Sequence, residues 1–102
     1  MLSHWVRAIL QATVYDVAIQ TPLEAAPKLT QRFANDIRFK REDLQPVKSF
    51  KLRGAYNRIN QLSDAQKARG VICSSACNHS QEFAYSACTL DLHNIMVIPT
   101  TS

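Results

Sequence analysis

Two short apolar runs, separated by one segment of helical length, constrain the fold of this chain more than any other feature. Residues 71–73 (Val-Ile-Cys) and 95–98 (Ile-Met-Val-Ile) are typical of buried strands, and Pro99 closes the second run. The segment between them repeats apolar residues at helical spacing, at Phe83, Ala84, Ala87 and Leu90. A strand, a helix and a second strand in this order favour parallel strands joined by a right-handed crossover.

The residues before this unit continue the alternation of helices and strands. Helices are predicted over residues 4–15 and 26–33, and the alternating residues 37–40 predict a half-buried strand. From Phe50 onward a helical stripe is formed by Leu52, Ala55, Tyr56, Ile59 and Leu62. The sequence therefore predicts an α/β fold with helices layered on an open parallel sheet. We expect that sheet to be truncated, because the chain stops just after an apolar strand.

Composition and charge exclude several classes of function. With 102 residues, 46% of them hydrophobic, the chain is expected to fold as one domain or less. Its net charge of +4 contains no run of five basic residues, so nucleic acid is not an expected partner. No stretch approaches the length of a membrane span. Three cysteines without paired spacing indicate the reducing cytoplasm, and a metal site is not expected because cysteine and histidine do not cluster at ligand spacing.

Residues 49–55, Ser-Phe-Lys-Leu-Arg-Gly-Ala, place Lys51 where a loop meets the start of a helix. A lysine that attacks a carbonyl group must first lose its proton, and neighbouring positive charge favours that loss. Arg41 and Arg53 lie nearby in the sequence. The plainer alternative is a solvated lysine in the first turn of an amphipathic helix, and composition alone favours that alternative.

A second polar segment, residues 75–81 (Ser-Ala-Cys-Asn-His-Ser-Gln), follows the first apolar run. Asn78 stands in the position of a helix N-cap, with Gln81 three residues later as in a capping box. Hydroxyl groups and backbone amides at the start of a helix suit a carboxylate ligand. An ordinary capped helix with a surface histidine explains the segment equally well.

Taken together, the two segments resemble the cofactor lysine motif and the substrate loop of the threonine dehydratases, which are pyridoxal-phosphate enzymes of fold-type II. The resemblance covers residues 5–100 and implies the cofactor pyridoxal 5′-phosphate. It implies that Lys51 holds the cofactor covalently and takes the α-proton of the substrate, that Phe50 packs near the cofactor ring, and that Asn78 binds the ring hydroxyl. It also implies L-threonine or L-serine as the substrate. The substrate side would be lined by Ser75, Ala76, His79 and Gln81.

This chain departs from the family pattern at one position of the second segment, at the position just after that segment, and at the phosphate site. The family has glycine where Cys77 and Glu82 stand, and a carboxylate at position 82 would repel an anionic substrate. A glycine-rich phosphate loop is missing, because the glycines are Gly54 and Gly70 alone.

The resemblance predicts residues 1–19 as an N-terminal helix and residues 20–102 as an incomplete N-terminal portion of a catalytic domain. The expected function is that of a threonine ammonia-lyase-like fragment, inactive alone, whose family makes 2-oxobutanoate and ammonia in isoleucine biosynthesis. The alternative is a non-catalytic interaction protein that pairs with itself or with a full-length relative. In both cases the open strand edge predicts self-association.

Overall fold

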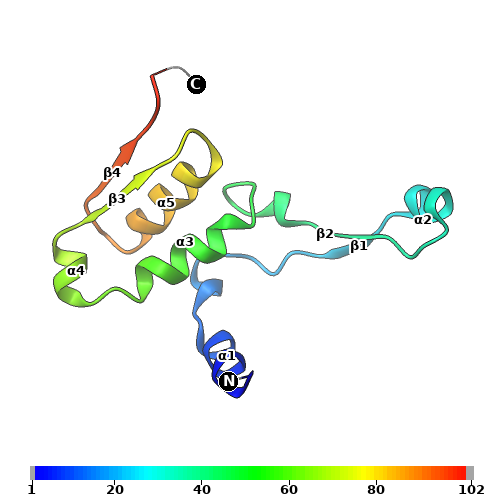
Figure 1. Cartoon of the computed structure of the whole chain (residues 1–102), viewed down its shortest axis with the longest axis horizontal. Coiled ribbons are helices and arrows are strands. Elements are labelled where there is room, and N and C mark those ends of the chain that lie inside the picture. Colours follow the sequence, from blue (N-terminus) through cyan, green and yellow to red (C-terminus); the bar gives the residue numbers. More distant parts are fainter. Residues whose placement is uncertain (1, 101–102) are drawn as a thin grey trace.

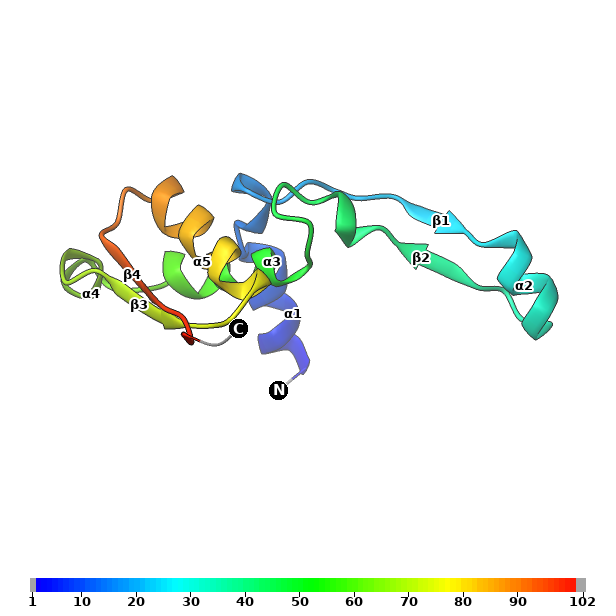
Figure 2. The ribbon, with the colours of Figure 1, turned by 90° about the horizontal axis from the view of Figure 1, so that it is seen from above.

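The computed structural model describes residues 2–100, which form an elongated molecule with a long arm (Figures 1 and 2). Its radius of gyration is 17.0 Å, whereas about 13 Å is typical of a compact domain of this length. The helices are α1 (Leu2–Gln11), α2 (Pro27–Phe33), α3 (Lys51–Asn60), α4 (Asp64–Ala68) and α5 (Asn78–Thr89). The strands are β1 (Leu23–Ala25), β2 (Arg38–Lys40), β3 (Val71–Ser74) and β4 (Asn94–Val97).

The β3–α5–β4 unit forms as its apolar pattern predicts. Strands β3 and β4 pair in parallel, with Val71 opposite Asn94 and Ser74 opposite Val97. Helix α5 connects them, and α3 lies against α5 (Figure 1). The run at residues 95–98 was expected to be covered on both faces, yet Ile95 and Val97 are each about half exposed, at 49% and 48%. Within residues 2–100, the elements that mainly contact β4 are β3 and α5.

The apolar stripe of α3 carries most of the core. Leu52, Ala55, Tyr56 and Ile59 are buried, as the helical spacing predicts. Leu52 and Tyr56 form a cluster with residues 17–18, which precede the arm. The hydroxyl of Tyr56 donates to Asp16 Oδ2 at 2.9 Å, and burial raises the pKa of that hydroxyl above its ordinary value. The start of the chain is thus tied to the middle of α3.

The arm corrects the prediction of a parallel sheet for residues 37–40. Strand β2 pairs antiparallel with β1, with Glu24 opposite Phe39, in a sheet separate from β3 and β4. Helix α2 closes the arm at its tip (Figure 2). Strand β1 has three residues, which is too short for the side-chain pattern to predict a strand. It forms because it pairs with β2.

Helix α1 ends earlier than the helix predicted over residues 4–15. It stops at Gln11, and a 3-10 turn follows at Val14–Asp16. The β-branched residues Thr13 and Val14 disfavour continuation of the helix. Its apolar residues Trp5 and Ile9 are largely exposed. None of the helices among residues 2–100 has the length and apolar character needed to cross a membrane.

A polar network holds the loop that leads into α3. Both Nε and Nη2 of Arg53 donate to the carboxylate of Glu42 at 2.9 Å, and Thr21 Oγ1 donates to the same carboxylate at 2.6 Å. The amide of Gln45, which is fully buried, bonds to both backbone groups of Ile19. Arg53, together with hydrogen bonds and against the effect of burial, lowers the pKa of Glu42 from 4.5 to about 2. This network fixes the chain just before Lys51.

Replacing Glu42 with glutamine is expected to destabilise the chain at pH 7 by about 1–3 kcal/mol. The carboxyl pKa is lower in the folded than in the unfolded chain, so its contribution is present above pH 4.5 and disappears as the pH falls through about 2. Urea unfolding followed by circular dichroism between pH 7 and pH 2 measures this difference. The matched control is Asp36→Asn, which removes an exposed ion pair with Arg38. Equal losses in both variants at pH 7 would contradict the role of the network.

Candidate cofactor-binding site

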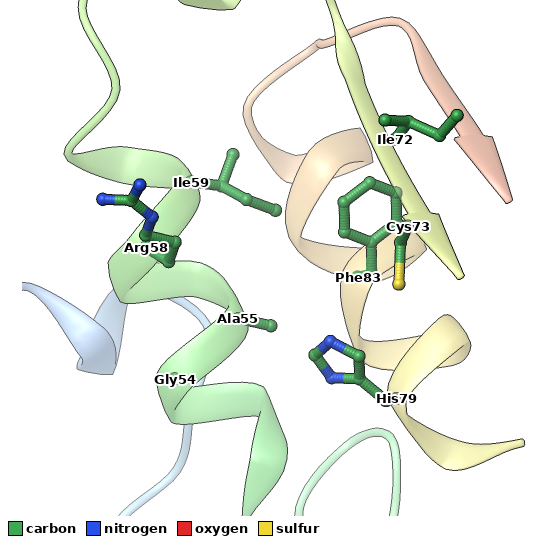
Figure 3. Close-up of a pocket in the computed structure, with 8 residues that line it drawn as sticks. All are labelled: Gly54, Ala55, Arg58, Ile59, Ile72, Cys73, His79 and Phe83. Atoms are coloured by element: carbon green, nitrogen blue, oxygen red, sulfur yellow. The ribbon is translucent and has the colours of Figure 1, made fainter. Parts of the chain in front are cut away.

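Two parallel helices begin at the same end of their packed pair (Figures 1 and 3). Lys51 is the first residue of α3, and Asn78 is the first residue of α5. The N-terminus of a helix carries partial positive charge and free backbone amides, which together attract anions. The fold therefore brings the two predicted segments to one end of the helix pair.

The turn before α3 presents the side chain of Lys51 to solvent. Lys48 has a positive φ of 62°, and its N–H donates to the carbonyl of Gln45 at 2.8 Å. The N–H of Lys51 donates to Oγ of the buried Ser49 at 3.3 Å. Within residues 2–100, no carboxylate forms an ion pair with Lys51. Its amine is thus exposed and available for chemistry.

The two arginines near Lys51 in the sequence are engaged elsewhere. Arg53 pairs with Glu42, and Arg41 pairs with Glu24 and Asp43. These carboxylates compensate both guanidinium charges, so neither arginine acts as a free positive charge near Lys51. The positive potential at the Lys51 amine then comes from the N-terminus of α3.

The second segment caps α5 differently from the prediction. The N-cap is Cys77, so Asn78 is already helical, and the Cys77 side chain makes no capping hydrogen bond. Instead, the N–H of Ser80 donates to the carbonyl of Cys77 at 3.0 Å. Asn78 is therefore the first residue of α5, and its side chain is exposed. Cys77 has a negative φ of −152°, so its backbone does not need the glycine found in the family.

The other predicted residues surround the start of α5 to different degrees. The N–H of Ser75 donates to the carbonyl of Val97 at 3.1 Å, which ties the segment to the end of β4. Ser75 and His79 are half-buried, whereas Ala76 and Gln81 are exposed. Phe50, expected beside the cofactor ring, is 64% exposed.

A cavity of about 250 Å³ lies farther along the two helices, between α3, α5 and β3 (Figure 3). His79 is the predicted site residue that lines it, and Lys51 and Asn78 do not. The other lining residues are Gly54, Ala55, Arg58, Ile59, Ile72, Cys73 and Phe83. His79 therefore connects the predicted substrate segment with an apolar space inside the helix pair.

The burial of Glu82 was not predicted from the sequence, which placed its carboxylate toward the substrate. It is fully buried on the stripe of α5 that also holds Phe83 and Ser86, and so does not face an incoming substrate. Nδ1 of His79 lies 3.8 Å from its Oε2. The predicted stripe of Phe83, Ala84, Ala87 and Leu90 does not include position 82, and a charged side chain is not expected to be fully buried.

The groups at the starts of α3 and α5 fit a phosphorylated pyridine aldehyde in part. The exposed amine of Lys51 suits covalent attachment to an aldehyde, and the exposed amide of Asn78 suits a ring oxygen. First-turn amides of α5 suit an anionic group. Gly54 lies inside α3 and Gly70 lies between α4 and β3, so residues 2–100 contain no glycine-rich phosphate loop.

Curated proteins are similar to this chain over most of its length. The chain is 53% identical over 94 residues to a chloroplastic biosynthetic threonine dehydratase of Solanum lycopersicum, covering 92% of this chain and 16% of that protein. It is 48% identical over 100 residues to the biosynthetic L-threonine dehydratase of Escherichia coli, covering 98% of this chain and 20% of that protein. The chain thus spans a fifth or less of the length of these relatives.

Solved structures agree with the sequence relatives. The processed form of threonine deaminase isoform 2 from Solanum lycopersicum matches 99% of this chain and 28% of its own, with a TM-score of 0.92 at 46% identity. Maize serine racemase matches 95% of this chain and 31% of its own, with a TM-score of 0.87 at 29% identity. The expected fold, part of the α/β fold of fold-type II enzymes, is confirmed. Because the model of the pyridoxal-phosphate dependent enzymes matches residues 14–102, this chain belongs to that family.

Proposed function

We propose that this chain supplies the cofactor lysine and the substrate segment of a threonine ammonia-lyase, which converts L-threonine to 2-oxobutanoate and ammonia. The observation that carries the proposal is the common start of α3 and α5, with Lys51 and Asn78 as their first residues. The similarity to threonine dehydratases at 48–53% identity supports L-threonine over L-serine as the substrate. It does not favour the alternative of a non-catalytic interaction protein.

Each residue at this end of the helix pair has a distinct task in the proposed reaction. Bound pyridoxal 5′-phosphate supplies an electron sink for the substrate α-carbon. Lys51 holds the cofactor and then accepts the α-proton at Nζ. Asn78 donates its amide to the ring oxygen, and Phe50 turns toward the ring.

The substrate carboxylate is assigned to the start of α5. There, the hydroxyl of Ser75 and the backbone amides that follow Ala76 donate hydrogen bonds, which the helix dipole strengthens. His79 and Gln81 line the remaining side of the substrate. The half-buried position of Ser75 supports this assignment, since a partly desolvated hydroxyl forms a stronger hydrogen bond to an anion.

The domain organisation and setting follow from the same proposal. Residues 1–19 form an N-terminal helical segment, and residues 20–102 form the N-terminal portion of a catalytic domain. The protein acts in the cytoplasm, without nucleic acid or membrane as a partner, and associates with further copies of itself. The exposed apolar strands of the β3–β4 sheet support that association.

A chimera tests the function directly. These 102 residues replace the matching segment of the Escherichia coli dehydratase, and 2-oxobutanoate is followed after addition of L-threonine. We expect turnover with L-threonine to exceed turnover with L-serine. A chimera that folds and binds cofactor, yet forms no 2-oxobutanoate, would contradict the proposal. Unmodified Escherichia coli enzyme is the control for the assay.

A further inference from the structure

Glu82 is buried without a hydrogen-bond partner for its carboxylate. Its exposed fraction is 0%, and neither Oε1 nor Oε2 accepts a hydrogen bond from any group among residues 2–100. Burying an ionised carboxylate without a partner is costly, so a side chain that can donate to it gains strongly by doing so. A nearby hydrogen-bond donor to the carboxylate oxygens of Glu82 would therefore stabilise the fold.

His79 is placed to be that donor. Its Nδ1 lies 3.8 Å from Oε2 of Glu82, one turn earlier on the same helix. This separation exceeds hydrogen-bond length, so the bond requires a side-chain rotation of the partly exposed His79, which faces Glu82 at a spacing of three residues along the helix. In the described part of the chain, Glu82 has no other ion-pair partner.

We propose that Glu82 is a positioning residue for His79. Its carboxylate accepts a hydrogen bond from Nδ1 of His79, which keeps the proton on that nitrogen and turns it toward the buried face of α5. The other ring nitrogen, Nε2, is then left for the cavity that His79 lines (Figure 3). In a neutral ring, the nitrogen that donates fixes the second nitrogen as an acceptor. The glycine found at this position in the family has no side chain to accept a hydrogen bond from the histidine. The proposed interaction is therefore specific to the present chain.

The hydrogen bond between Glu82 and His79 determines which substrate groups His79 can bind. An acceptor Nε2 pairs with a donor, such as the hydroxyl or the ammonium group of a hydroxy amino acid, and not with a carboxylate. This consequence rests on the proposed substrate-side role of His79. The orientation of the ring does not, and it can be measured without cofactor or substrate.

Solid-state ¹⁵N NMR of the full 102-residue chain, labelled at histidine, reads which ring nitrogen carries a proton regardless of particle size. The chain has three histidines, and His79 is assigned by the signal lost in His79→Gln. We expect a protonated Nδ1 in the parent chain. Glu82→Gln, whose amide oxygen still accepts, retains it, whereas Glu82→Leu moves the proton to Nε2. Tyr85→Leu, at an exposed position of the same helix outside the proposed site, leaves the signal unchanged and is the matched control.

Two outcomes would overturn the proposal: an unprotonated Nδ1 in the parent chain, or a protonated Nδ1 that persists in Glu82→Leu. If Glu82→Leu does not fold, dipolar coupling between Glu82 Cδ and His79 Nδ1 in the parent decides the matter, and its absence refutes the pair. The NMR signals are measured on the 102-residue chain without cofactor or substrate, so they do not depend on whether the chimera turns over threonine. Failure of the proposed function is therefore distinguishable from failure of this inference.

Discussion

Replacing Lys51 with alanine in the chimeric enzyme is expected to abolish formation of 2-oxobutanoate. The change removes the amine that holds the cofactor and the base that takes the α-proton. Loss of a general base alone typically costs a factor of about 10²–10⁴ in rate, and loss of covalent attachment adds to it. The expected result is activity indistinguishable from the background reaction.

Borohydride reduction identifies the attachment site independently of turnover. Reduction of the cofactor-loaded chimera, followed by peptide mapping, should label the peptide that contains Lys51, and Lys51→Ala should lose that label. Lys48→Ala and Lys67→Ala are the controls, since both lysines are available in the same chain and neither begins α3. Label spread evenly over all lysines would refute the assignment of Lys51.

The 102 residues alone are expected to self-associate and to show no threonine turnover. Large apolar side chains are exposed on the β3–β4 sheet, with Ile72 at 69% and Ile98 just beyond β4 at 62%. Exposed apolar strands favour pairing between chains. Without a glycine-rich loop, the cofactor phosphate lacks the donors that usually anchor it.

Sedimentation and an assay for 2-oxobutanoate test both parts on one sample. The double variant Ile72→Lys, Ile98→Lys should reduce the particle size, because charge on an exposed strand opposes pairing between chains. Leu23→Lys, at an exposed position of the arm, is the matched control and should leave the particle size nearly unchanged. A compact monomer that turns over threonine would show that the argument from exposed strands and missing donors is wrong.

Patterns that repeat over a whole element predicted their structure well. The stripe of Leu52, Ala55, Tyr56 and Ile59 forms the buried face of α3. This feature depends on contacts within one or two turns, so local spacing suffices to predict it. The resemblance to a family added the identity of the lysine segment, which composition alone would have left as a solvated helix start.

Short or shared features could not be predicted in the same way. Strand β1 exists only through its pairing with β2, and the network around Glu42 joins residues far apart in the sequence. The capping of α5 differed by one residue, since the choice between Cys77 and Asn78 depends on where the chain leaves β3. Such details arise from contacts that no local pattern records.

The amino-acid sequence by itself determined the family and the order of strand, helix and strand in the β3–α5–β4 unit, because local periodicity and motif residues act over a few positions. Only the tertiary structure decided that α3 and α5 start at one end, that residues 38–40 leave the parallel sheet for the arm, and that Glu82 lies buried beside His79. The physical reason is that burial and pairing depend on which surfaces meet, and the two helices meet only when the chain between them has folded back.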